Sequence, residues 1–239
     1  MGKFLVLALL FSLSPLHSQD AVINKSKGKI YAADADGKAI DVKKVKTLRE
    51  GCTVKTGPRS ECEVLFKDGS LIFLSENTGL KIEKAKLTEE EQDYGFNFFK
   101  GKVLFFVNKA KRKFHSYKVR TPTAVCAVRG TDFSIIASSE SSRIGLFEGA
   151  MNVEKDGESR ELQPGHEAVV AREIAVADRL SSIMNKEKKR ADKLRKYVEG
   201  VRAKVEKRAE FIEKKLDKTR EKLDGLYEKQ KGKPDKPGN

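Results

Sequence analysis

The chain has few of the residues from which metal sites and catalytic centres are built. Its 239 residues include three histidines, three cysteines and no tryptophan. His115 lies in KFHSYKV and His166 in PGHE, so neither belongs to the i, i+4 histidine pair of a helical metal site. The sequence also lacks a Gly-Xaa-Ser-Xaa-Gly elbow, a Walker loop and a GxGxxG motif. We therefore expect no enzymatic activity, no catalytic residue, no cofactor and no metal ion.

The three cysteines leave two structural alternatives open. Cys52 shares strand parity with Val54, and Cys62 with Val64, so both thiols can face one core and form a disulfide in an oxidising compartment. Alternatively, all three are buried free thiols that pack as small apolar side chains. Cys126 lies in an apolar run, which raises the pKa of a thiol and makes it a poor nucleophile.

Long hydrophobic runs are absent beyond the N-terminus. Residues 1–18 combine Lys3, an apolar stretch over residues 4–13, a helix-breaking Pro15 and the small Ser18 before a plausible cleavage point at Gln19. This pattern predicts a signal peptide and hence an exported protein of the periplasm or cell envelope. A membrane anchor would need about 20 apolar residues, and this run is shorter.

Acidic residues are outnumbered, which makes the chain basic. Lysine and arginine total 49 against 35 acids, for a net charge of +14. Such an excess favours polyanions, among which anionic lipid and lipopolysaccharide suit an exported protein better than nucleic acid. The candidate contacts are clustered near the C-terminal third: Lys188, Lys189, Arg190, Lys193, Arg195 and Lys196.

Short apolar runs separated by glycine turns occupy residues 19–172 and predict a mainly β domain. Asp36-Gly37 between two such runs predicts a hairpin, and residues 52–56 and 62–66 alternate with the period of a half-buried strand. Residues 103–107 are apolar on both faces, as in a strand buried on both sides. We expect an all-β sandwich, barrel or solenoid-like sheet.

The stretch KVRTPTAVCAVRGTDF, residues 118–133, contains the sharpest local features. Pro122 marks a strand edge or bend, because proline cannot donate a ladder hydrogen bond. Residues 124–128 are apolar on both faces, which predicts a buried strand. Gly130 permits a corner with positive φ or a bulge, and we expect Arg129 to hold that corner by bonding carbonyls or a carboxylate such as Asp132.

This stretch resembles the signature of the FecR-type domain, a β-rich periplasmic module. The likeness covers roughly residues 24–172 and includes the turns GCTVKTG, FEG and LQPGHE. The resemblance implies structural roles for Thr121, Pro122, Val128, Arg129, Gly130, Thr131, Phe133, Glu148 and Gly149. It also implies protein interaction and signalling rather than catalysis. The chain departs from the sigma-regulating members of the family, because its β region directly follows the predicted signal peptide.

Proline is absent from residues 173–231, and this highly charged segment predicts a long helix. A heptad-like apolar seam runs along it: Leu180, Met184, Ala191, Leu194, Val198, Val201, Val205 and Ile212. Glu187, Arg208 and Lys215 interrupt the seam. Three arrangements fit this pattern, namely a coiled coil with another copy, a hairpin near Gly200 or Gly225, and a lone charged spacer. Residues 232–239 are expected to be a disordered tail.

Together these features predict a non-enzymatic, exported FecR-like protein that acts as a binding, signalling or scaffold module in the envelope. The envelope protein that it binds is not specified by the sequence. Two alternatives use the helix differently: an adaptor that forms a homo-oligomer through a coiled coil, and a protein that binds anionic lipid or lipopolysaccharide through its basic helix.

Overall fold

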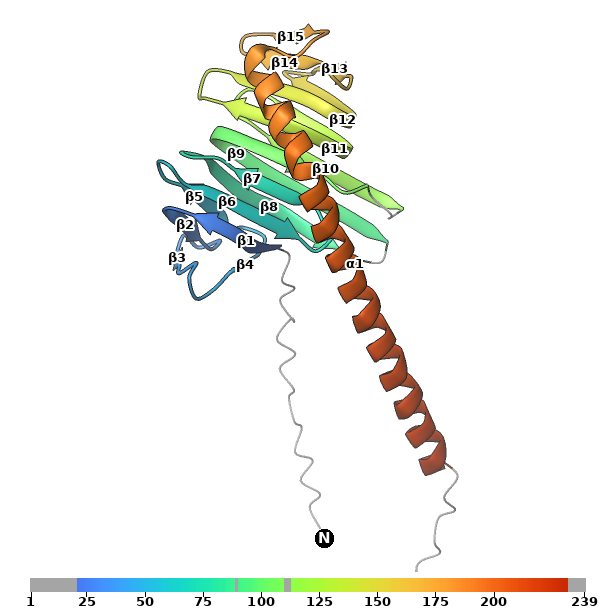
Figure 1. The fold of residues 1–239 in the computed structure, drawn as a ribbon. Helices are drawn as coiled ribbons and strands as arrows, with labels where there is room; N and C mark the ends of the chain where they lie inside the picture. The colour runs from blue at the N-terminus through green and yellow to red at the C-terminus, as the bar shows by residue number, and fades with distance from the viewer. Residues whose placement is uncertain (1–20, 89, 110–112, 232–239) are drawn as a thin grey trace, which may run out of the picture.

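The computed structural model describes residues 21–88, 90–109 and 113–231, which form one sheet of 15 strands followed by a single long helix (Figure 1). The mainly β architecture with a C-terminal helix is therefore as predicted. The signal peptide and the tail expected from the sequence lie outside the described residues. Within the described part, no helix is both long and apolar enough to cross a bilayer.

The sheet folds over on itself into two layers. Three long strands contribute to both layers: β9 (Glu91–Phe106), β11 (Val125–Ala137) and β12 (Ser142–Lys155). The layer nearer the helix, called the helix-side layer, also contains β1 (Ala21–Lys27), β4 (Thr47–Leu48), β6 (Glu61–Phe66), β7 (Leu71–Leu74), β14 (Glu167–Val170) and β15 (Ile174–Ala177). The outer layer contains β2 (Ile30–Ala33), β3 (Ala39–Ile40), β5 (Thr53–Thr56), β8 (Gly79–Leu87), β10 (Phe114–Arg120) and β13 (Glu158–Leu162).

Strand β9 shows how the layers are connected. Its first part pairs with β8 and β10, and its second part pairs with β7 and β11. The rings of Phe96 and Phe105, both in β9, have centroids 6.1 Å apart. A straight strand would separate these residues by about 30 Å. The strand therefore bends sharply between them, and the aromatic side chains from its two parts meet in the core, where Phe105 also stacks on Phe133 at 4.6 Å.

The helix-side layer is buried on both of its faces. In β9, Val103 and Phe105 face the core between the layers, whereas Leu104 and Phe106 belong to a second apolar cluster beneath the helix. This confirms the prediction that residues 103–107 form a strand apolar on both sides. The same expectation is wrong for residues 124–128, because Val125 is only half-buried in a part of β11 that lies in the outer layer.

The short-range features of the β region are largely as expected. Strands β2 and β3 pair antiparallel across the turn that contains Gly37, which confirms the hairpin. Cys52, Cys62 and Cys126 are all buried and free, so the disulfide alternative does not apply. Burial raises the pKa of the Cys126 thiol to about 12, which keeps it protonated and unreactive.

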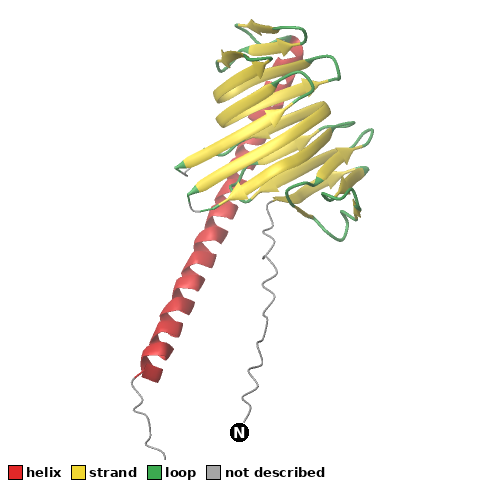
Figure 2. Cartoon of the chain, turned by 180° about the vertical axis from the view of Figure 1, so that it is seen from behind, coloured by secondary structure: helices red, strands yellow, loops and turns green. Residues whose placement is uncertain are grey.

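Helix α1 (Ser182–Lys231) begins where the hydroxyl of Ser181 accepts a hydrogen bond from the backbone N–H of Met184 at 3.4 Å. It continues through Gly200 and Gly225, which excludes the hairpin. The β region extends past residue 172 to the end of β15. At 1.5 Å per residue α1 is about 75 Å long. Its first half crosses the helix-side layer and its second half extends beyond the sheet (Figures 1 and 2).

Candidate functional site

The first half of α1 is docked on the sheet by the apolar seam. Met184, Ala191 and Val198 are at most 1% exposed. They lie over strands β7, β9 and β12, and the cluster beneath the helix includes Leu71, Phe73, Leu104, Phe106, Phe147, Ala191 and Val198. We call residues 182–205 the docked half and residues 206–231 the projecting half. The seam that suggested a coiled coil is thus covered by the chain's own sheet over the docked half.

Glu187 interrupts the apolar seam but is a buried contact. Its side chain is 5% exposed and accepts a hydrogen bond from Lys102 Nζ at 2.9 Å. One turn later, Arg190 Nη1 donates to the hydroxyl of Ser75 at 2.9 Å, and Arg190 Nη2 lies 3.7 Å from the carboxylate of Glu61. Because a buried carboxylate is costly without a partner, these contacts fix the register of α1 on the sheet.

The family-signature residues form the corner where β11 and β12 bend. Gly130 has a φ of +57° at a break in the β11–β12 register, which confirms the predicted corner. Gly149 has a φ of +91°, and a Cβ there would lie 2.4 Å from the carbonyl oxygen of Gly130. A side chain at Gly149 would therefore clash with the backbone of the neighbouring strand.

The remaining signature residues separate into buried and exposed positions. The buried ones are Thr121, Val128, Thr131 and Phe133, and the exposed ones are Pro122, Arg129 and Glu148. Thr121 accepts a hydrogen bond from the backbone N–H of Ala124 at 2.9 Å, which closes the turn around Pro122. These positions support a structural role for most of the signature.

Asp132 and Glu148 connect the signature corner to the helix. Arg195 Nη1 lies 3.1 Å from the carboxylate of Asp132 and 2.6 Å from that of Glu148. Asp132, one of the partners expected for Arg129, thus forms its described ion pair with Arg195. The alternative that Arg129 bonds backbone carbonyls stays a prediction. Burial raises the pKa of Asp132 to about 6, against the opposing effect of the Arg195 guanidinium.

The predicted polyanion contacts are divided between internal and open positions. Arg190 and Arg195 are engaged with the sheet, and Lys188 pairs with Asp192 at 3.2 Å. The other three, Lys189, Lys193 and Lys196, are exposed, and Lys193 also lines a groove between α1 and the sheet. The basic segment is therefore partly structural and partly available to a ligand.

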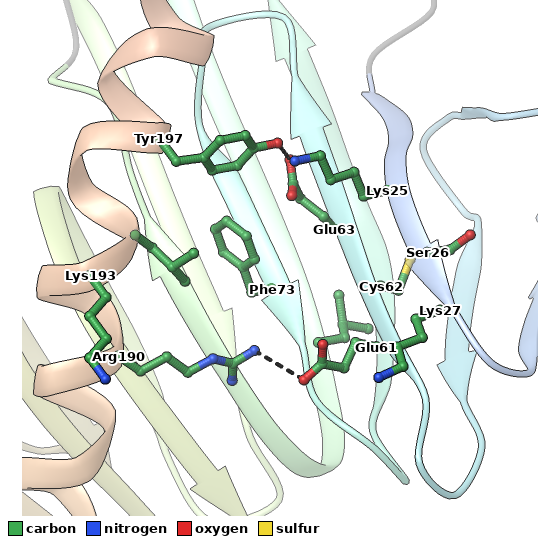
Figure 3. A pocket seen from close by; sticks show the side chains of 12 residues that line it. Lys25, Ser26, Lys27, Glu61, Cys62, Glu63, Phe73, Arg190, Lys193 and Tyr197 are labelled. Carbon is green, nitrogen blue, oxygen red and sulfur yellow. Dashed lines mark hydrogen bonds and ion pairs between the residues drawn. The ribbon is translucent and has the colours of Figure 1, made fainter.

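A groove of about 560 Å³ opens between the docked half and strands β1, β6 and β7 (Figure 3). Phe73 and Leu194 are among its apolar lining residues. At one end, Tyr197 donates a hydrogen bond to the carboxylate of Glu63 at 2.7 Å, and Lys25 Nζ lies 3.9 Å from the centre of the Tyr197 ring. These contacts hold the Glu63 carboxylate, which is buried.

The other end of the groove is basic. Lys27 of β1 and Arg190 and Lys193 of α1 line it together with Glu61. The groove therefore presents cations beside an apolar floor, an arrangement that suits an anion rather than a reaction. Sequence reasoning identified Arg190 and Lys193 but missed Lys25 and Lys27, which are distant in sequence. Their alternation along β1 was the available signal, because it places both side chains on one face of the strand.

The histidines do not come together with other metal ligands. His115 is in β10 and His166 is in the turn before β14. Across the residues that the structure describes, no group of three or more His, Cys, Asp or Glu side chains could hold a metal ion.

Comparison with known proteins finds a family likeness for part of the β region. Residues 52–152 match the family described as FecR protein. This part of the chain is similar to a FecR domain. The match includes the whole signature corner, from Thr121 to Gly149, and it supports a binding or signalling module. No curated protein matches the chain.

Two solved structures resemble part of this chain. Both are crystal structures of a protein from Parabacteroides distasonis titled a "putative anti-sigma factor", at 1.65 Å and 2.50 Å resolution. The sequence identities are 19% and 20%, and the TM-score is 0.46 in each case. The alignments cover 53% of this chain and 59% of the other. The chain therefore spans little more than half of the length of these proteins.

Proposed function

We propose that this protein is an exported, non-enzymatic FecR-domain module that binds a protein partner in the periplasm or cell envelope. The β domain serves as a rigid platform and the projecting half of α1 serves as the contact arm. The observation that carries this proposal is the division of α1, because the apolar seam that docks its first half continues, exposed, along its second half.

The projecting half repeats the docking pattern of the first half. Ala209, Ile212, Leu216 and Leu223 form its apolar stripe, and Leu216 and Leu223 are 55% and 60% exposed. Ile212 and Leu216 follow Leu194 and Val198 by about five full turns at 3.6 residues per turn. The stripe therefore faces the same side as the docked seam, beyond the edge of the sheet. An exposed apolar stripe of this kind is typical of a helix that packs against a partner helix.

The charges beside the stripe indicate the charge pattern that a partner helix would need. Arg208 and Lys215 interrupt a strict heptad seam, but a straight helix drifts by about 20° per heptad and places them with Lys222 along one flank of the stripe. The other flank carries Glu213, Asp217 and Asp224. An amphipathic helix with acids facing the basic flank and bases facing the acidic flank would complement both sides. Such pairing sets partner choice more than affinity.

Self-association, the competing function, fits the same stripe less well. In an antiparallel pair, the basic flank of one copy would face the basic flank of the other, which is repulsive. In a parallel pair, packed helices lie 8–10 Å apart. The docked half of the second copy would then fall where the first copy has its sheet. The arm therefore suits a different protein better than a second copy.

The proposal is tested by a pull-down from crosslinked envelopes with the full chain and with Leu216→Glu, a change in the stripe. We expect Leu216→Glu to lose the main crosslinked partner and Lys214→Glu, a charge change on the opposite helix face, to retain it. Cell fractionation of the same strains tests export. A partner set that Leu216→Glu leaves unchanged would refute the contact arm. A full chain that doubles its mass in light scattering as its concentration rises would favour the homo-oligomeric adaptor.

A further inference from the structure

The solvent face of α1 carries a row of lysines along both of its halves. Starting at Lys186 and moving in steps of three or four residues, the face presents Lys186, Lys189, Lys193, Lys196, Lys204 and Lys207. The row continues with Lys214 and Lys218, and all of these side chains are exposed. We call this row the lysine ridge. At 100° per residue it lies well away from the apolar seam around α1, so most of it faces away from the sheet, while Lys193 also lines the edge of the groove beside β1 and β6.

The ridge is free of acids. Between Lys186 and Lys218, the same three- and four-residue steps pass through Gly200 and Phe211, and neither position carries a charge. The acids of α1 lie on other rows: Glu187 faces the sheet, and the row beside the ridge carries Asp192, Glu199 and Glu210, three residues after Lys189, Lys196 and Lys207. The ridge is thus a straight line of positive charge about 48 Å long at 1.5 Å per residue.

Phe211 is the one aromatic side chain among the ridge positions just traced. It is 62% exposed, and Lys215 Nζ lies 5.6 Å from the centre of its ring. The position lies outside the apolar stripe, so docking against a partner helix does not account for it. A bulky apolar group flanked by lysines is suited to the boundary between lipid headgroups and acyl chains, where the ring is buried and the ammonium groups stay among phosphates.

We propose that the lysine ridge lays α1 flat on an anionic membrane surface, with Phe211 inserted among the headgroups. The geometry permits this, because α1 lies across one face of the sheet (Figure 1) and the ridge lies on another side of the helix than the apolar seam that contacts the sheet. Lysine is a compact, strongly hydrated charge without the planar fork that arginine offers to individual phosphates. The ridge therefore fits a diffuse anionic surface better than a shaped ligand.

This surface is independent of the contact arm, since ridge and stripe lie on opposite faces. A protein bound to a membrane by the ridge would hold the apolar stripe away from the lipid and available to a partner. The loss of either activity would therefore leave the other intact, and the two proposals fail separately.

The test is flotation of the full chain with vesicles of phosphatidylcholine alone or mixed with phosphatidylglycerol. We expect binding only to the mixed vesicles, weakening as salt rises. The triple change Lys189→Gln, Lys193→Gln and Lys196→Gln should reduce binding on the order of a hundredfold, at about 1 kcal/mol per lysine. A matched triple change in the outer layer, Lys55→Gln, Lys100→Gln and Lys118→Gln, removes the same charge and should have little effect.

Phe211→Ser separates a membrane from a soluble polyanion. We expect it to weaken binding to the mixed vesicles about tenfold and to leave binding to dextran sulfate unchanged. All the substituted residues are exposed, so circular dichroism should show the fold intact. If both triple variants lost the same amount of vesicle binding, the lysine ridge would not be the binding surface. The membrane proposal would be wrong if the protein bound dextran sulfate as tightly as vesicles and Phe211→Ser weakened neither interaction. That result would favour a linear polyanion as the ligand.

Discussion

The two halves of α1 carry a similar apolar periodicity and have different surroundings. In the docked half, Val198 is 1% exposed against strands of the sheet, whereas Leu216, about five turns later, is 55% exposed. Hydrophobic spacing therefore specifies which face of a helix is apolar and leaves open what covers it. In this chain one stripe serves first as an intramolecular interface and then as an exposed surface.

The polar residues of the two halves differ more than the apolar ones. In the docked half, Glu187 and Arg195 reach charged groups on β9, β11 and β12. In the projecting half, the charges form rows along the helix, as in the flank of Arg208, Lys215 and Lys222. Long-range ion pairs thus mark the half of α1 that belongs to the folded domain.

A charge in the apolar seam should have the largest effect and should depend on the half in which it is placed. Val198→Asp would bury an unpaired carboxylate against the sheet, and we expect it to lower the free energy of unfolding by about 3 kcal/mol or more. Leu216→Asp should change it by less than about 0.5 kcal/mol. Urea denaturation measures both, and hydrogen exchange of α1 should show undocking only for Val198→Asp. Equal losses of unfolding free energy for the two variants would mean that both halves of α1 are packed to the same extent.

Removing the cation that connects α1 to the signature corner should have an intermediate effect. Arg195→Gln leaves Asp132, whose side chain is 8% exposed, without its ion pair. We expect a loss of about 1–2 kcal/mol, moderated because Arg195 itself is partly exposed. Lys196→Gln, one residue along on the solvent face, is the control and should be neutral. A neutral Arg195→Gln would show that apolar packing alone holds the docked half.

The same contact should make stability depend on pH. Asp132 has an ordinary pKa of 3.8 and a folded-state pKa of about 6, and it faces Arg195, Arg202 and Asp192 of α1 and Glu148 of β12. The folded state binds this proton more tightly than the unfolded state. The contribution of Asp132 to stability therefore rises as pH falls from about 7 towards 4.

Comparison with Asp132→Asn isolates this contribution from that of other acids. Melting temperatures measured between pH 4 and pH 7.5 should converge for the two proteins near the acidic end, after allowance for a constant offset. The native chain should lose stability relative to Asp132→Asn as pH rises through about 6. A difference between the two that is constant with pH would contradict the raised pKa.

Replacing the helical glycines should have the smallest effect on stability, and the effect should again differ between the two halves of α1. A Cβ at Gly200 or at Gly225 meets nothing within 4 Å. Gly200→Ala adjoins the docked contacts, and we expect it to raise the free energy of unfolding by up to about 1 kcal/mol. Gly225→Ala should raise the helical signal in circular dichroism without shifting the unfolding midpoint. A shift of the midpoint by Gly225→Ala would show that the projecting half unfolds together with the domain.

Much of the β domain was predictable because its signals are local. Asp36-Gly37 marks a hairpin, Gly130 marks a corner and residues 103–107 mark a strand buried on both sides, and the structure has each of them. Each signal depends on neighbouring residues, whose preferences do not require knowledge of the tertiary arrangement. The error at residues 124–128 arose because small apolar residues such as Ala127 tolerate partial exposure.

The candidate site was less predictable because its contacts join distant parts of the chain. The faces of β7 and β9 that point away from the core between the layers are apolar and had to be covered, and the apolar seam of α1 had to pack against something. No local signal in the sequence indicated that these two surfaces pack against each other. Glu187 looked like an interruption of the seam and is a buried partner of Lys102. Arg195 was grouped with the available lysines, although the carboxylates of Asp132 and Glu148 bind it.

The lengthwise docking of α1 has a mechanical consequence. A partner pulling on the projecting half would load the helix along its axis, parallel to the row of contacts formed by Glu187, Arg190 and Arg195. Under such shear these contacts share the tension instead of opening one after another. The force would arrive at the bend of β11 and β12 through Asp132 and Glu148. In the proposed function, the signature corner is therefore where a load on the projecting half reaches the β domain.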